Sequence, residues 1–241
     1  MQDNSRVITG AQTDCHERLE QVVRRNLESR FLRPIAPHNA HAYSEFKKNW
    51  QQQPLIIDSC CGTGQSSMRL ANSHPDSFIL GVDKSLARLA VGERQLEQIT
   101  APPDNLLLLR ADLIDLYRLA AADGINLSKH FIYYPNPWPK SSHLQRRWHA
   151  SAVFKHMLAL GGQIEIRSNW QVYLEEFQAA LSVLNIDSTV QAIQFDHRNS
   201  DNDDAFVSNF ERKYAQSGQQ LWQLSASIPL EQSSMIKQSY C

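Results

Sequence analysis

Short apolar runs alternate with helix-like stretches along most of this chain. The runs at residues 55–57, 78–82, 106–109, 131–134 and 163–166 predict five buried strands. Apolar spacing predicts helices near residues 65–72 and 173–184. Because continuous apolar strands alternate with helices, the pattern indicates an α/β fold, with a mostly parallel sheet and helices on both faces.

The first fifty residues follow a different pattern. Asp14 followed by Glu17 resembles an N-terminal helix cap, and apolar residues recur at helical spacing from Leu19 to Leu27. We therefore expect an N-terminal helical extension over 1–50 and an α/β domain over 51–241. Four arginines in or after this helix could form a solvated face or a surface that approaches a polyanion: Arg24, Arg25, Arg30 and Arg33.

Composition restricts the classes of protein. The 241 residues carry 24 basic and 25 acidic side chains, so a globally basic nucleic-acid clamp is excluded, although a local basic patch is not. The four cysteines have no zinc-ligand spacing, and no chemistry is assigned to the adjacent Cys60 and Cys61. With neither a signal-like start nor a long apolar window, we expect a cytoplasmic protein without metal or membrane contact. Residues 196–204 are expected to form an exposed acidic loop.

Polar residues follow the predicted strands at the points where they end. They are Asp58, Asp83, Asp112, Asn136 and Asn169. Parallel α/β sheets bind ligands outside the carboxyl ends of their strands. The sequence therefore predicts one site along this edge.

A tight glycine turn follows the first of these acids. Gly62 and Gly64 allow the backbone to approach a ligand closely, and the next helix presents free N–H groups. A dinucleotide site needs a third glycine where Ser67 stands, which favours S-adenosylmethionine, whose ammonium suits Asp58. Asp83 could accept from ribose hydroxyls in either cofactor, and Asp112 could accept from an adenine amino group.

The most specific string is Tyr-Pro-Asn-Pro-Trp-Pro-Lys at residues 134–140, followed by Ser-Ser-His-Leu-Gln-Arg-Arg at 141–147. It resembles the Pro-Asp-Pro-Trp, Lys, Arg-His and Lys-Arg-Arg pattern of the bacterial tRNA (guanine-N7)-methyltransferases. Residues 166–173 resemble that family's Thr-Asp-Trp segment, and residues 208–212 its Thr-x-Phe-Glu-x-Arg segment. The resemblance runs from about residue 54 to 224 and suggests a divergent member.

This resemblance implies a Rossmann-like, class I S-adenosylmethionine-dependent methyltransferase with a seven-stranded sheet, acting on tRNA. It implies a catalytic position at Asn136, which also adjoins the cofactor with Asp58, Gly62, Gly64, Asp83 and Asp112. The substrate residues that it implies are Lys140, Arg146, Arg147, Asn169, Ser208 and Glu211. Asn136 and Asn169 replace aspartates of the family, and Ser142 and Gln145 replace an arginine and a lysine, all in the substrate half.

These replacements leave alternatives open. Methyl transfer to guanine N7 needs no general base, so the residues must position the base and tolerate its growing positive charge. An asparagine in place of a carboxylate forfeits a charge-assisted hydrogen bond of about 1.5–3 kcal/mol, which would slow the reaction or suit another base. The chain could therefore methylate a different substrate or be a binding relative, whereas Ser67 disfavours a nicotinamide dehydrogenase. Trp138 and Trp170 could stack on a flipped base or pack beneath the site.

Overall fold

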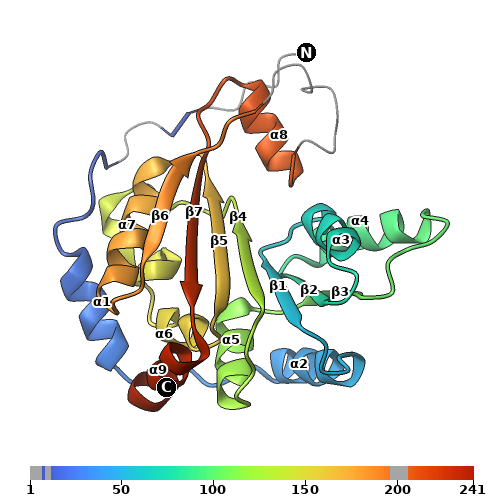
Figure 1. Ribbon diagram of the computed structural model, residues 1–241, viewed down its shortest axis with the longest axis horizontal. Coiled ribbons are helices and arrows are strands. Elements are labelled where there is room, and N and C mark those ends of the chain that lie inside the picture. The colour runs from blue at the N-terminus through green and yellow to red at the C-terminus, as the bar shows by residue number, and fades with distance from the viewer. Residues whose placement is uncertain (1–6, 9–11, 196–205) are drawn as a thin grey trace.

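The computed structural model describes residues 7–8, 12–195 and 206–241, so the predicted acidic loop at 196–204 lies outside the described residues. The five predicted strands are confirmed, and two more complete a seven-stranded sheet in the order β3-β2-β1-β4-β5-β7-β6 (Figure 1). The strands are β1 (Leu55–Ser59), β2 (Phe78–Asp83), β3 (Leu106–Arg110), β4 (Lys129–Tyr133), β5 (Gly162–Ser168), β6 (Ser188–Ala192) and β7 (Trp222–Ile228).

The sheet is mostly parallel, as predicted, with one antiparallel member. β1 pairs in parallel with β2 on one side and with β4 on the other. β7 runs antiparallel to both β5 and β6. Because the chain builds outward from β1 to β3 and then returns to β4, the order reverses between β1 and β4. Such a reversal opens a crevice at the carboxyl ends of the two strands.

The helices lie around this sheet. They are α1 (Leu19–Glu28), α2 (Pro37–Asn49), α3 (Gln65–Ser73), α4 (Leu86–Glu97), α5 (Leu113–Ala122), α6 (Phe154–Leu158), α7 (Gln171–Ser182), α8 (Asn209–Gln216) and α9 (Leu230–Tyr240). The helices predicted near 65–72 and 173–184 are confirmed as α3 and α7. The predicted cap at Asp14 is wrong, because α1 begins at Leu19 and Arg18 occupies the capping position.

Alternating strand residues divide the core between the two faces of the sheet. Ile57, Leu80 and Ile132 belong to a large cluster with residues of α1, α2, α5, α6 and α7. Ile56, Ile79 and Phe131 belong to a smaller cluster with residues of α3. Successive side chains of a strand point to opposite faces, so helices cover both faces of the central strands.

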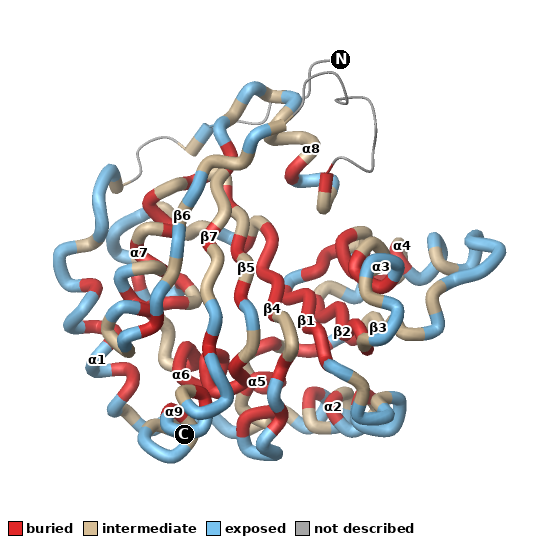
Figure 2. Tube along the Cα trace, viewed as in Figure 1, coloured by how far each residue is buried: buried red, intermediate tan, exposed pale blue. Residues whose placement is uncertain are grey.

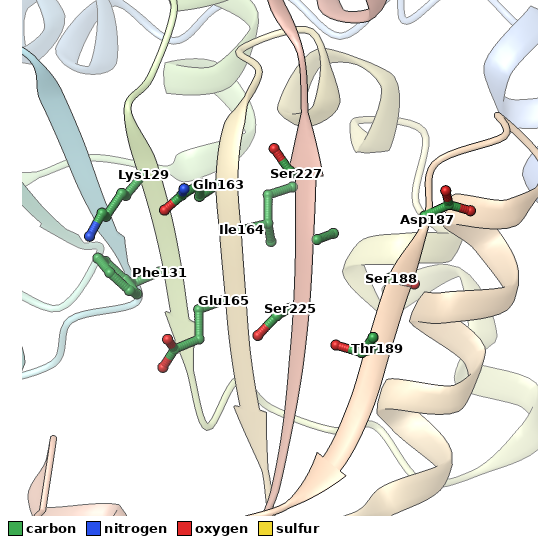
Figure 3. A pocket seen from close by; sticks show the side chains of 11 residues that line it. Lys129, Phe131, Gln163, Ile164, Glu165, Asp187, Ser188, Thr189, Ser225 and Ser227 are labelled. Atoms are coloured by element: carbon green, nitrogen blue, oxygen red, sulfur yellow. The ribbon is translucent and has the colours of Figure 1, made fainter.

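One face is left open over β5, β7 and β6. In Figure 1, α7 lies behind these strands, and no helix of the described residues covers their front. Figure 2 shows the matching mixture of exposed and half-buried segments along them. A hollow of about 430 Å³ on this face is lined by polar side chains, including Lys129, Gln163, Glu165 and Ser225 (Figure 3). None of the predicted site residues lines it.

The N-terminal helices are integral to the fold. Leu19 and Leu27 of α1, and Phe46 of α2, are buried in the larger cluster. Arg33 pairs with Asp115 at 2.6 Å, which fixes the segment between these helices to α5. Arg24 pairs with Glu20 on α1 at 2.8 Å. Two of the four N-terminal arginines are therefore engaged within the chain.

Candidate active site

The glycine turn connects β1 to α3 by backbone that only glycine adopts easily. Gly64 precedes α3 with φ of 75°, and Gly62 has φ of 63°, both in the left-handed region. A Cβ on Gly64 would lie 2.8 Å from the side chain of Leu108, whereas one on Gly62 would meet nothing within 4 Å. Gly62 therefore borders open space that a ligand could enter.

Asp58 lies at the end of β1 and is completely buried. Its Oδ2 accepts hydrogen bonds from Ser66 Oγ at 2.5 Å and Ser67 Oγ at 2.6 Å, both from the first turn of α3. Burial raises the pKa of the Asp58 carboxyl to about 6, against the opposing effect of the two serine hydroxyls. Its Oδ1 is buried without a hydrogen-bond partner among the described residues.

A buried carboxylate oxygen without a hydrogen-bond partner costs free energy of folding. A cationic ligand that donates to this oxygen would remove that cost. The ammonium group of S-adenosylmethionine is positively charged and carries N–H donors, so it complements this acceptor oxygen. The donor set therefore fits S-adenosylmethionine. Ser67, which stands where a dinucleotide site needs glycine, instead donates to this carboxylate.

Asp83 ends β2 beside the glycine turn and is 5% exposed. Its Oδ2 accepts from the Gly62 N–H at 3.1 Å, and its Oδ1 accepts from the Ser85 N–H at 2.7 Å. The guanidinium of Arg88 lies 3.6 Å from Oδ2. Each carboxylate oxygen has room for a second donor, so this geometry fits the predicted contact with two ribose hydroxyls.

Asp112 follows β3 and caps the first turn of α5. Its Oδ1 accepts from the Ile114 N–H at 3.0 Å, and its Oδ2 lies 3.4 Å from the guanidinium of Arg33. The carboxylate therefore already has a structural role. Its predicted contact with an adenine amino group stays a prediction.

The segment after β4 carries the most specific string of the sequence. Tyr134 and Trp138 have φ of 51° and 47°, values that are unusual for residues other than glycine. Such strain costs about 1–3 kcal/mol per residue and persists only where other contacts hold it. Asn136 lies between them and is exposed, and its Oδ1 accepts from the Trp138 N–H at 3.4 Å. We call residues 134–140 the β4 loop.

Two of the predicted basic residues lie on the surface of this region. Lys140 is exposed at the end of the β4 loop, and Arg146 is exposed on the short helix that follows. The Arg146 guanidinium lies 4.8 Å from the centre of the Trp138 ring, a cation–π contact. The edge of His143 packs against the same ring at 5.5 Å.

The resemblance implied a substrate contact for Arg147, but this side chain does not reach the surface. Its side chain is completely buried and paired with the equally buried Glu176 of α7. Its guanidinium also donates to the carbonyl oxygens of Trp138 at 3.2 Å and Lys140 at 3.4 Å. The local pattern of charges could not reveal this, because the acid partner lies 29 residues away in sequence.

The predicted substrate segment near the C-terminus begins α8. Ser208 caps this helix by accepting from the Glu211 N–H at 3.2 Å. Glu211 is completely buried and accepts from Tyr134 Oη at 2.8 Å, Arg167 Nη1 at 2.8 Å and Val207 N at 2.7 Å. Glu211 therefore anchors α8 to the β4 loop and β5, and a substrate contact by it stays a prediction.

Asn169 and Trp170 follow β5. The Asn169 amide donates from Nδ2 to Gln219 Oε1 at 2.9 Å. Trp170 is buried, with the Arg147 guanidinium 5.0 Å from its ring centre. For Trp170 the packing alternative therefore holds, whereas the half-buried Trp138 lies within the β4 loop itself.

The structure brings the predicted residues together along one edge. Asp58 and Asp83 adjoin the glycine turn, and β4, which leads to Asn136, pairs directly with β1. Strand β5, which leads to Asn169, pairs with β4. The partners that hold the site residues were not predicted from the sequence. They are Ser66 and Ser67 for Asp58, Arg167 for Glu211, and Glu176 for Arg147. The serine hydroxyls at the start of α3 were the one local signal available for them.

Over the part of the chain that the structure describes, no group of three or more histidine, cysteine or acidic side chains could hold a metal ion. Within the same residues, no helix is both long and apolar enough to span a membrane.

Comparison with known proteins gives the same fold and a family. Among solved structures, the 16S rRNA methyltransferase KamB aligns with a TM-score of 0.56 at 13% identity, covering 84% of this chain and 98% of its own. An antibiotic-related methyltransferase aligns with a TM-score of 0.55 at 13% identity, covering 85% of this chain and 98% of its own. At such identity, the likeness shows the fold alone.

Sequence relatives are closer. A protein of Pediococcus pentosaceus named tRNA (guanine-N(7)-)-methyltransferase is 27% identical over 214 residues, which are 80% of this chain and 97% of that protein. An Enterococcus faecalis protein of the same name is 24% identical over 194 residues, or 76% of this chain and 86% of that protein. A family model described as "Putative methyltransferase" matches residues 52–224, which is most of the chain. The chain therefore belongs to this methyltransferase family.

Proposed function

We propose that this protein is an S-adenosylmethionine-dependent tRNA (guanine-N7)-methyltransferase. The observation that carries the proposal is the position of the β4 loop, which begins at the end of a strand paired directly with the strand of Asp58. The loop bears the string Pro-Asn-Pro-Trp-Pro-Lys that resembles this enzyme class. The names of the relatives from Pediococcus pentosaceus and Enterococcus faecalis support the same substrate.

In this proposal, the cofactor supplies an electrophilic methyl group, and the chain binds and orients the two reactants. Asp58 Oδ1 accepts from the cofactor ammonium, Asp83 accepts from the ribose hydroxyls, and Gly62 lets the backbone approach. Guanine N7 carries a lone pair and no proton, so no side chain has to remove one. Proximity and orientation therefore account for most of the required rate enhancement.

The substrate half holds and orients the base. The Asn136 side chain lies in the β4 loop, where its amide oxygen can accept from a base edge. Lys140 and Arg146 are exposed cations beside it and suit the RNA backbone. An amide stabilises the growing positive charge of the purine less than a carboxylate does, so we expect slow turnover.

The direct test is methylation of bulk tRNA that lacks modifications. The protein is incubated with this tRNA and methyl-labelled S-adenosylmethionine at low salt, and the nucleosides are identified by mass spectrometry. We expect 7-methylguanosine as the labelled product. A methylated adenosine would assign another base, and cofactor binding without any product would indicate a binding relative.

A further inference from the structure

A buried ion pair lies directly beneath the β4 loop and contacts its backbone. The pair joins Arg147, which precedes a single turn of 3₁₀ helix, to Glu176 in the middle of α7. Neither side chain is exposed to solvent. Arg147 therefore cannot contact an RNA substrate at the surface. A completely buried guanidinium must act through the residues that it contacts.

The guanidinium is aligned by contacts on three sides. Glu176 Oε2 accepts from Nη1, the Trp170 ring lies beneath at 5.0 Å, and the Gln12 Oε1 lies 3.3 Å from Nη2. Glu176 in turn accepts from His149 Nε2 at 3.0 Å and from the His16 N–H at 2.9 Å. Burial opposes ionisation of Glu176, but the hydrogen bonds from His149 and Arg147 outweigh it and lower its pKa to about 2.

The remaining donors of the guanidinium contact the β4 loop. Nε and Nη2 both donate to the carbonyl oxygen of Trp138 at 3.2 Å, and Nη2 also reaches that of Lys140 at 3.4 Å. These two carbonyl groups belong to the residues on either side of Pro139, and the first of them, Trp138, is the one with the strained φ. A planar guanidinium can hold both carbonyls and the carboxylate at once, because its five donors form a rigid fork.

We propose that Arg147, held by Glu176, is a positioning residue that fixes the β4 loop in its strained conformation. The inference rests on the proposed methyl transfer, because the loop carries Asn136 and Lys140. Fixing two backbone carbonyls fixes the direction in which these neighbouring side chains project. Binding and catalytic constellations need such support, since small misplacements lower the rate strongly.

The test compares Arg147→Lys with Arg118→Lys. Both replace a largely buried, ion-paired arginine, but Arg118 pairs with Asp115 of its own helix, α5. A lysine at 147 keeps the charge opposite Glu176 and loses the fork. We expect Arg147→Lys to lower the single-turnover rate of methyl transfer about 10- to 100-fold at saturating tRNA. Its cofactor affinity should match that of Arg118→Lys, which should transfer methyl groups at the wild-type rate. The unfolding midpoint of Arg147→Lys should be the lower of the two, because its buried hydrogen bonds are lost.

Hydrogen–deuterium exchange gives a readout that does not depend on activity. We expect faster exchange in peptides covering residues 136–144 of Arg147→Lys, and unchanged exchange there in Arg118→Lys. If Arg147→Lys fails to fold, Glu176→Gln tests the same link, because it keeps the shape while removing the charge. It should show the same two changes with smaller size.

Two results would overturn the inference. One is a wild-type rate together with unchanged exchange in the loop. The other is a rate loss matched by an equal loss of cofactor affinity, with unchanged exchange in the loop, which would indicate a structural role only. If the wild-type protein transfers no methyl group, the proposed function fails, but the exchange comparison still decides whether Arg147 holds the loop.

Discussion

The two halves of the candidate site are built by different means. In the cofactor half, Asp58 and Asp83 are buried and held by nearby backbone and hydroxyl donors. Asp58 is held by serines 8 and 9 residues away, and Asp83 by a glycine 21 residues away. In the substrate half, Asn136, Lys140 and Arg146 are exposed on a segment with two strained residues.

The substrate half is instead held from a distance. Arg147 contacts Glu176 across 29 residues, and Tyr134 contacts Glu211 across 77. The cofactor half is therefore a local device of strand, turn and helix, whereas the substrate half depends on the assembled fold. This difference indicates that the substrate half can change its chemistry while the cofactor half stays constant, as the two asparagines suggest.

The largest expected effect lies in the cofactor half. Asp83→Asn should weaken S-adenosylmethionine binding more than about 100-fold, because one acceptor oxygen is replaced by an NH₂ donor and the hydrogen bond to the other is no longer charge-assisted. Calorimetry measures the affinity, with the exposed Asp76→Asn as a matched control that should bind normally. Normal binding by Asp83→Asn would remove Asp83 from the cofactor site.

The pH dependence of Asp58 is the next test of the same half. Its pKa in the folded protein is about 6, above the ordinary value of 3.8, so the folded state binds more protons than the unfolded state between these values. The contribution of Asp58 to stability therefore falls as pH rises from about 4 to 6, by an amount on the order of 2–3 kcal/mol.

Chemical unfolding of wild type and Asp58→Asn across this range measures the effect. We expect the stability of the wild type relative to the variant to fall as pH rises. Excess S-adenosylmethionine should offset the loss, because its ammonium favours the ionised carboxylate. Parallel pH profiles for the two proteins would show that burial does not raise the pKa of the Asp58 carboxyl.

The smallest expected effect is on methyl transfer, from a substitution in the substrate half. Asn136→Asp restores the residue of the resembling family and should raise methyl transfer about tenfold by adding a charge-assisted interaction. Cofactor affinity should change less than the transfer rate, since Asp58 and Asp83 are untouched. Labelled methyl incorporation into tRNA measures the rate. A decrease would show that the asparagine suits a different substrate and would separate the two halves still further.

Much of the fold followed from short-range pattern. The continuous apolar runs at residues 55–57 and 78–82 predicted strands because a strand buried on both faces leaves few polar positions. The late strands β6 and β7 were not located. Their polar and apolar residues alternate on a sheet with one open face, as in Gln223 and Ser225 beside the buried Leu224. Such short alternating segments resemble loops when read alone.

In the site, the sequence can nominate residues where chemistry and position lie in one segment. Asp58, Gly62 and Gly64 could be recognised because a strand end, an acid and a glycine turn follow one another along the chain. Arg147 and Arg146 could not be told apart, since both are arginines after the same loop. Only the fold shows that one stacks on Trp138 at the surface while the other is buried against Glu176.

The sequence by itself determined the order of the first five strands, the edge at which polar groups gather, and the likeness to a methyltransferase family. These properties depend on local hydrophobic periodicity and on residues that are close in the chain. The tertiary structure alone decided which charges are buried in pairs and what supports the β4 loop. Those contacts join residues far apart in sequence, and they form only where the fold brings both partners together, because burying either charge alone would be costly.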